Sequence, residues 1–328
     1  MRKLASQLID FVREDFDPFV YLGTALLLVV LCVANYQYDA FDPLLSETRS
    51  PLKIVNYVLF YGGPWLTVLL LQALRGRLTN PPPPRDGTPS WAVHRGVDVS
   101  FVPAACAALF IVSFTDWFPY HTDLRKLIAA KELQPWVRPI IWNLKSTTTW
   151  LVPMAAWWVL RDRSRQVPFL YGLTRQGFDI RPYLMCLSVI VPLVTWASFQ
   201  DAFLQTYPTY KPWKGVETYL GVHPFFTVLP YELIYGFDFS FVEMYFRGFL
   251  IIGLARWLGT NAVLPMVAMY AVLHFGKPLP ETIGSIFGGY ILGVFALRSG
   301  SILGGILLHL GVAWSMEATA MLQHWWRG

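Results

Sequence analysis

Charged side chains are scarce in this chain. Asp, Glu, Lys and Arg make up 14% of its 328 residues, whereas 55% of the residues are hydrophobic, and the mean hydropathy is +0.42. A typical soluble domain carries about 25% charged residues, so the composition excludes an ordinary soluble protein and indicates one that crosses a membrane several times. In such a chain the positions of Lys and Arg are more informative than the net charge of +5, and we expect no nucleic-acid partner.

Cysteine is scarcer still, and no internal repeat is evident. Cys32, Cys106 and Cys186 each lie in an apolar run without CxxC spacing, which excludes a disulfide or zinc framework and favours small buried side chains. Without a repeat, a transporter that relays protons between two related halves is a weak hypothesis. The first apolar run is long and lacks a clear small-residue cleavage site, so we expect no cleaved signal peptide.

Long hydrophobic runs, in contrast, are frequent. Judged against a hydrocarbon core of about 30 Å, they predict an all-α bundle of eight or nine transmembrane spans in a multi-pass protein of the lipid bilayer. The spans lie near residues 19–36, 54–74, 99–114, 146–160, 182–199, 229–254, 260–275, 282–297 and 301–322. Residues 1–17 alternate apolar and charged positions at helical spacing, which predicts an amphipathic helix in the membrane interface that Pro18 ends.

Two arginine-rich loops predict the orientation of the bundle. The loops 75–96 and 161–181 contain Arg75, Arg77, Arg85 and Arg95, and Arg161, Arg163, Arg165, Arg175 and Arg181. Loops rich in Lys and Arg stay on the cytoplasmic side. With nine spans the N-terminus is then cytoplasmic, and we expect the plasma (inner) membrane as the location.

Three later segments carry ionisable residues in apolar surroundings. Glu243 and Arg247 are four residues apart, so on an α-helix they share one face and could form a buried ion pair that fixes helix register. His274 and His309 lie in two further apolar segments, and either alone could be a core histidine bonded to a backbone carbonyl. Because ionisable groups are costly inside a membrane and are usually functional there, we predict that Glu243, His274 and His309 face one cavity.

A carboxylate near imidazoles in a poorly hydrated site can hydrolyse a bond in two ways. Glu243 could act as a general base on a water held by histidine. Alternatively, Glu243, His274 and His309 could bind a divalent metal such as zinc, which lowers the pKa of its bound water. We favour the metal-free mechanism, and nothing else in the sequence indicates a cofactor.

Glycines concentrate in the last third of the chain. They include Gly284, Gly288, Gly289, Gly293, Gly300, Gly304, Gly305 and Gly311. Small residues at four-residue spacing let helices approach closely. We expect this packing to hold the helices of His274 and His309 within reach of Glu243.

The order of these residues resembles a known family. The segment Glu243-Met244-Tyr245-Phe246-Arg247-Gly248, then Tyr270 four residues before His274, then His309, is similar to the motifs of the CPBP intramembrane proteases, which include CAAX-processing endopeptidases and bacteriocin-processing and self-immunity proteins. The resemblance covers residues 165–322, which would form a protease-like core. The N-terminal transmembrane helices of residues 18–164 would belong to the same continuous membrane domain. It implies hydrolysis of a membrane-embedded or membrane-associated peptide, prenylated or leader-type. By the family's motifs, Glu243 would be the base, His274 its partner on the attacking water, and His309 an oxyanion donor or third polar ligand.

Three positions depart from the family's motifs. Val242 replaces the first of two adjacent glutamates, and Ala313 lies where Asn or another small or polar residue is frequent. Tyr270 replaces a phenylalanine, which is a milder change. The charged and aromatic residues that could support the site are Arg247, Tyr270, Lys277, Glu281 and Glu317. The Pro278-Leu279-Pro280 break predicts that His274 lies at a helix end or re-entrant bend, although Lys277 and Glu281 could equally be an exposed interfacial pair. The alternative function is therefore that of an inert relative, a binding, immunity or accessory subunit of a membrane complex.

Overall fold

The computed structural model describes residues 2–45, 53–79, 89–118, 128 and 130–327. These residues form helices and no strand, which confirms the predicted all-α class. Helices suit a chain in lipid because each one satisfies its backbone hydrogen bonds internally. Arg85, one of the arginines on which the predicted orientation depends, lies outside the described residues.

In the described part of the chain, ten helices have more than ten residues: α1 (Arg2–Asp15), α2 (Pro18–Tyr38), α4 (Lys53–Leu74), α5 (Phe101–Trp117), α7 (Gln134–Trp157), α8 (Arg181–Ala197), α11 (Phe225–Glu243), α13 (Val263–Leu273), α14 (Leu279–Ser299) and α15 (Leu303–Arg327). Shorter α-helices are α3 (Asp42–Leu45), α9 (Asp201–Thr206), α10 (Val216–Leu220) and α12 (Ala255–Leu258). The π-helices are η3 (Trp158–Asp162) and η7 (Met244–Gly253). The 3-10 helices are η1 (Ser90–Ala92), η2 (Lys131–Leu133), η4 (Arg163–Arg165), η5 (Phe169–Tyr171), η6 (Pro212–Lys214) and η8 (Gly259–Ala262).

The chain divides into two compact units, each made of segments that are distant in sequence. The first unit consists of Met1–Trp117, Val152–Phe178 and Met244–Leu303. The second consists of Phe118–Leu151, Asp179–Glu243 and Gly304–Gly328. The predicted boundaries at residues 17 and 164 remain a sequence-based division.

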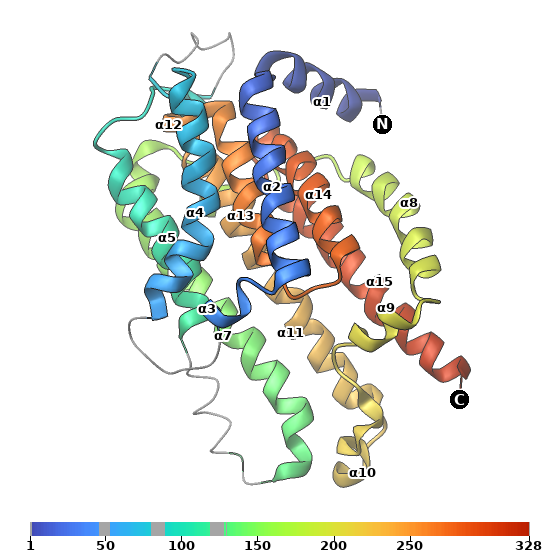
Figure 1. Ribbon diagram of the computed structural model, residues 1–328. Helices are drawn as coiled ribbons and strands as arrows, with labels where there is room; N and C mark the ends of the chain where they lie inside the picture. Colours follow the sequence, from blue (N-terminus) through green and yellow to red (C-terminus); the bar gives the residue numbers. More distant parts are fainter. Residues whose placement is uncertain (1, 46–52, 80–88, 119–127, 129, 328) are drawn as a thin grey trace. The chain divides into compact units, whose positions relative to one another are not determined.

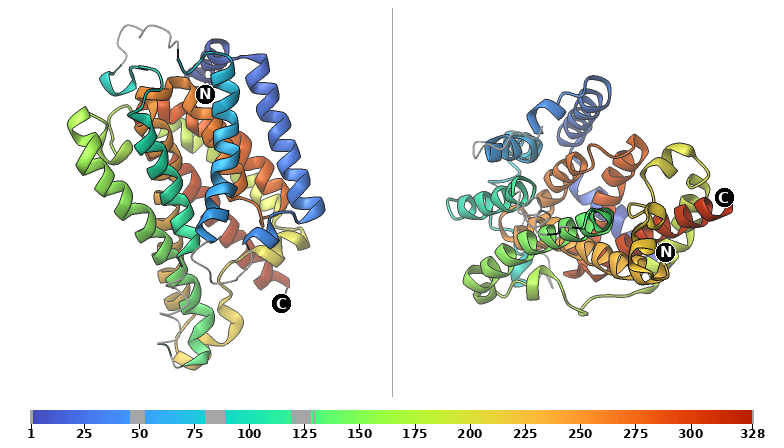
Figure 2. Two further views of the ribbon diagram at one scale, coloured as in Figure 1. Left: turned by 60° about the vertical axis from the view of Figure 1, so that its left-hand side comes forward. Right: turned by 90° about the horizontal axis from the view of Figure 1, so that it is seen from below.

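Helix α13 forms the core of the first unit. Every residue from Val263 to Val272 is buried, and the helix packs against α2, α4 and α14 (Figure 1). A helix that is apolar on all sides needs neighbours on all sides. Figure 2 shows α2 and α4 side by side; on α2, Leu22 and Leu26 are 69% and 65% exposed, as expected of side chains that contact lipid.

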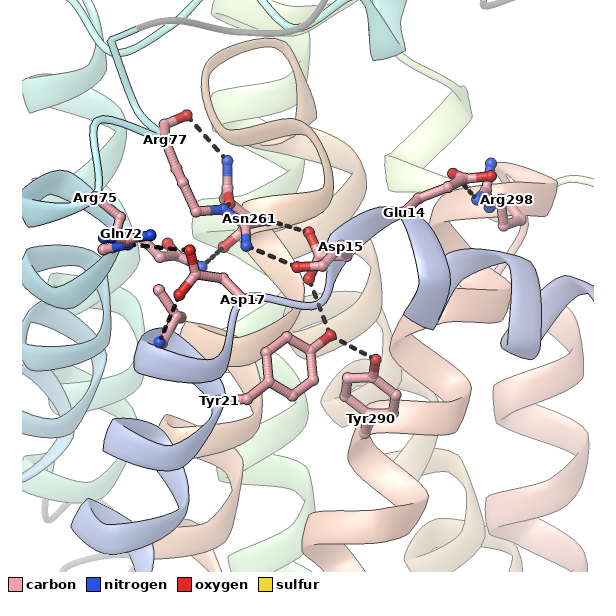
Figure 3. Close-up of polar contacts among 11 residues, drawn as sticks. Glu14, Asp15, Asp17, Tyr21, Gln72, Arg75, Arg77, Asn261, Tyr290 and Arg298 are labelled. Carbon is pink, nitrogen blue, oxygen red and sulfur yellow. Dashed lines mark hydrogen bonds and ion pairs between the residues drawn. The ribbon is translucent and has the colours of Figure 1, made fainter.

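Polar contacts attach α1 to the other helices of the first unit (Figure 3). Asp15, the last residue of α1, forms an ion pair with Arg77 and accepts a hydrogen bond from the Tyr21 hydroxyl at 3.0 Å. The hydroxyl groups of Tyr21 and Tyr290 lie 2.8 Å apart, which connects α2 with α14. Arg77 also donates through Nε to Asn261 at 2.7 Å, so the end of α1 is tied to three other parts of this unit.

The boundary between α1 and α2 differs slightly from the prediction. Helix α1 ends at Asp15, two residues before the predicted end, and Pro18 is the first residue of α2. The Asp17 side chain accepts a hydrogen bond from the Val20 backbone N–H at 3.1 Å and so caps α2. Proline fits the first helical turn, where its missing N–H costs no hydrogen bond. The placement of α1 in a membrane interface stays a prediction.

In the second unit, α11 contacts both α15 and α7. Trp314 of α15 donates its indole N–H to the Glu232 carbonyl of α11 at 3.1 Å, and Ser146 of α7 donates to the Asp238 carboxylate. Gly304 of α15 lies against the Tyr183 ring of α8, where a Cβ atom would clash. The glycine prediction of close helix packing therefore holds within this unit.

Among the described residues, four helices are long and apolar enough to cross a membrane: α2, α4, α14 and α15. The bent pair Phe225–Gly253 and Ala255–Leu273, with an angle of 44° between its parts, would make a fifth. The predicted count of eight or nine spans is therefore not confirmed. Helices α5 and α8, which match two of the predicted spans, have only 17 residues each, which is at the lower limit for spanning.

Candidate active site

Glu243 is the last residue of α11, at the point where the helix type changes. Residues Met244–Gly253 continue as the π-helix η7, whose hydrogen bonds run from i to i+5 and are frequent at functional sites. The prediction that Glu243 and Arg247 share one face depended on α-helical geometry. That geometry ends at Glu243, so the four-residue spacing no longer implies a shared face.

The Glu243 carboxylate contacts His309 within the second unit. Its Oε1 lies 3.0 Å from His309 Nδ1, the Glu243 side chain is fully buried, and the His309 side chain is 18% exposed. With the carboxylate ionised, Nδ1–H of His309 is the donor, which leaves Nε2 unprotonated in the neutral ring. The structure thus joins two predicted site residues that are 66 positions apart in the sequence.

Two further residues shape this contact: Gly305, which the sequence indicated only as a packing glycine, and Phe239, which the sequence did not single out. Gly305 lies one helical turn before His309 on α15, and a Cβ atom there would collide with Oε2 of Glu243. Phe239 lies one turn before Glu243 on α11, and its ring centroid is 4.4 Å from that of His309. The four-residue spacings of Gly305 to His309 and of Phe239 to Glu243 are the sequence signal that could have identified both.

Arg247 and His274 belong to the first unit, where Tyr270 lies between them. The Arg247 guanidinium carbon is 4.1 Å from the centroid of the Tyr270 ring, and Arg247 is 1% exposed. The Tyr270 ring also meets His274 edge to face at 4.5 Å and Phe246 at 4.8 Å. A tyrosine ring face attracts a guanidinium cation, so Tyr270 positions two predicted site residues at once.

His274 lies at the end of α13, as the proline break predicted. It is the C-cap residue of that helix, and its carbonyl accepts hydrogen bonds from the Lys277 N–H at 3.1 Å and the Thr282 hydroxyl at 2.9 Å. Its Nδ1 lies 2.9 Å from the Tyr270 carbonyl. Because a carbonyl only accepts, Nδ1 carries the proton and Nε2 of the neutral ring is a proton acceptor.

The remaining supporting residues make contacts of their own. Lys277 and Glu281 form an ion pair with each other at 3.4 Å, with side chains 42% and 23% exposed; the location of this pair in a membrane interface stays a prediction. Glu317, in the second unit, is buried and accepts from the Thr209 N–H at 3.0 Å and its hydroxyl at 2.7 Å. It therefore anchors the segment before α10 to α15.

The metal hypothesis takes its ligands from both units. Within each unit, the described residues contain no group of three or more His, Cys, Asp and Glu side chains that could hold a metal ion. A set of Glu243, His274 and His309 as zinc ligands stays a prediction. The prediction that these three side chains share one cavity also stays open, whereas the contact between Glu243 and His309 is observed.

One comparison with known proteins finds a match. The family model described as Type II CAAX prenyl endopeptidase Rce1-like matches residues 224–315, and this match confirms the predicted resemblance to CAAX-processing proteases. It extends from the residue before α11 into α15 and includes Glu243, His274 and His309. No curated protein and no solved structure matches the chain.

Proposed function

Because residues 224–315 match the family model described as Type II CAAX prenyl endopeptidase Rce1-like, we propose that this membrane protein belongs to that family and is an intramembrane endopeptidase. Its substrates are peptides attached to or embedded in the membrane, of the prenylated or leader type. The observation that carries the proposal is the 3.0 Å contact between Glu243 and His309. A buried carboxylate that an imidazole holds in place can act as a general base on a nearby water.

In this mechanism, Glu243 takes a proton from water. The resulting hydroxide oxygen bonds to the carbonyl carbon of the scissile peptide and gives a tetrahedral oxyanion. Glu243 then returns the proton to the amide nitrogen as the carbon–nitrogen bond breaks. No metal is needed for the proton and electron balance of these steps.

In this mechanism, the two histidines orient the catalytic carboxylate and the attacking water. His309 donates Nδ1–H to Glu243 Oε1, which fixes the position of the carboxylate. We assign His274 to the water from the family's motifs, and the tautomer of His274 set by the Tyr270 carbonyl suits its role as an acceptor. The one N–H of the neutral His309 ring is given to Glu243, so His309 serves to hold the carboxylate. Arg247 and Tyr270 serve as supporting residues.

The alternative is an inert relative that binds peptide without cleaving it. Val242 stands where the family has a first glutamate, and Ala313 stands where a polar residue is frequent, which favours loss of turnover. In that case Glu243 fixes the packing of α11 on α15 through His309, and the protein acts as a binding, immunity or accessory subunit.

The test compares Glu243→Gln and Val242→Glu in the full chain reconstituted in vesicles, with a farnesylated peptide and a leader-type membrane peptide as substrates. Gln keeps the shape of Glu and loses its basicity, so Glu243→Gln should abolish cleavage while the protein stays folded. Glu14→Gln is the matched control, since Glu14 pairs with Arg298 on α14, outside the proposed site. An inactive parent protein that gains cleavage only through Val242→Glu would show that the inert alternative is right.

A further inference from the structure

The first unit contains a polar cavity, apart from the residues proposed to act on peptides. Its volume is about 340 Å³. The walls come from η1 and the segment between η1 and α5, from the residues around η4, and from α12. They include Trp91, Arg95, Asp98, Arg165, Arg256 and Trp257. We call this cavity the arginine pocket.

Arginine dominates the charge of the pocket. Three guanidinium groups line it, against the single carboxylate of Asp98, which already accepts the Ser100 N–H at 2.8 Å. Behind the wall lies buried Asp162, which is 3.3 Å from Arg256 and 3.9 Å from Arg165. Three cations and two carboxylates leave an excess of one positive charge, so the pocket favours an anion.

Arg256 is held in a fixed position. Its guanidinium carbon lies 3.7 Å from the centroid of the Trp257 ring, and its side chain is 13% exposed. The Tyr171 hydroxyl donates to Asp162 at 2.9 Å and orients the carboxylate that pairs with Arg256. A preorganised guanidinium fork binds carboxylate and phosphate oxygens in pairs.

The surroundings of the pocket decide which anion fits. Two residues of the pocket lie at the ends of apolar helices. Ser100 comes directly before α5, and Arg165 lies three residues after η3, which continues α7. Tryptophan and arginine near the ends of apolar helices are typical of the headgroup level of a membrane. Basic pockets at that level recognise phosphorylated headgroups, and a volume of about 340 Å³ exceeds what a bare phosphate ion requires.

The geometry points to a phosphate-binding site in the arginine pocket, built for the headgroup of an anionic phospholipid. Arg256 and Arg165 would contact the phosphate oxygens, Arg95 would supply further charge at the rim, and Trp91 and Trp257 would lie beside the glycerol. The site is independent of peptide hydrolysis. It would bind lipid whether or not Glu243 acts as a base.

The test measures lipid retained by the purified full chain from vesicles of phosphatidylcholine with and without phosphatidylglycerol, by native mass spectrometry. The double variant Arg95→Gln/Arg165→Gln removes two accessible charges and spares Arg256, whose loss would leave Asp162 without that partner. We expect selective retention of phosphatidylglycerol in the parent protein and a loss on the order of tenfold in the double variant. Arg163→Gln/Arg175→Gln is the matched control, because both arginines are exposed and neither lines the pocket.

A competition experiment separates the two sources of phosphate. If inorganic phosphate displaces the lipid at millimolar concentration, the site takes phosphate from either source; if it does not, the site requires the headgroup. Both results support a phosphate site. Equal losses in the two double variants, no preference for phosphatidylglycerol, or loss of binding only to an acidic peptide would overturn the assignment.

Discussion

Replacement of Gly305 by alanine is expected to lower the rate of cleavage about 100-fold with little effect on folding. An added Cβ would lie 3.1 Å from Cδ of Glu243 and well inside 3.0 Å of its Oε2, a separation that real Cβ atoms essentially never show. The carboxylate is the far end of a flexible side chain, so it would swing away and the helices would stay in place. That movement breaks the 3.0 Å contact with His309 Nδ1.

The expected magnitudes of the two effects differ. A displacement of the base on the order of 1 Å lowers the rate about 100-fold. For stability, alanine in a helix interior gains about 1 kcal/mol over glycine, whereas overpacking costs about 1–3 kcal/mol, so the net loss is about 1 kcal/mol. The variant therefore lowers activity without removing any chemical group.

The assay compares cleavage of the reconstituted peptide with thermal unfolding followed by tryptophan fluorescence. Gly288→Ala is the control, since a Cβ on this helical glycine meets no atom within 4 Å. Full activity in Gly305→Ala would refute the reasoning, because the position of Glu243 would then not matter. Loss of the folded protein together with activity would show that Gly305 acts through packing alone.

Three other measurements test separate parts of the structure. Asp15→Asn should destabilise the protein by about 3 kcal/mol in chemical unfolding, because it leaves Arg77 without its carboxylate partner in a largely buried pair. Glu14→Gln breaks a more exposed pair with Arg298 and should cost less than about 1 kcal/mol. Equal effects of the two substitutions would contradict the reasoning from burial. Single cysteines placed in the loops 75–96 and 161–181 should be labelled only from the cytoplasmic side, and labelling from outside would reverse the orientation. Metal analysis of the purified protein and of His274→Ala should find no stoichiometric metal in either, since the proposed steps use none; zinc in the parent that is lost in the variant would support a metal site.

The apolar runs determined the helical class, because a chain in lipid satisfies its backbone groups within helices. Local sequence also placed His274 at a helix end, since the prolines at 278 and 280 disfavour an α-helix through the residues before them. The motif around Glu243 indicated the resemblance to CAAX-processing proteases, and a family model of these proteases matches residues 224–315. These features depend on neighbours within a few residues, which the sequence displays directly.

Only the tertiary structure decided which partners the charged residues have. Glu243 contacts His309, 66 positions away, and the π-helix after Glu243 ended the register that predicted a shared face with Arg247. Arg75 and Arg77, interpreted from sequence as markers of orientation, pair with Asp17 and Asp15. Such contacts depend on how distant helices pack, and packing is set by the shapes of all the side chains between them, which no local pattern encodes.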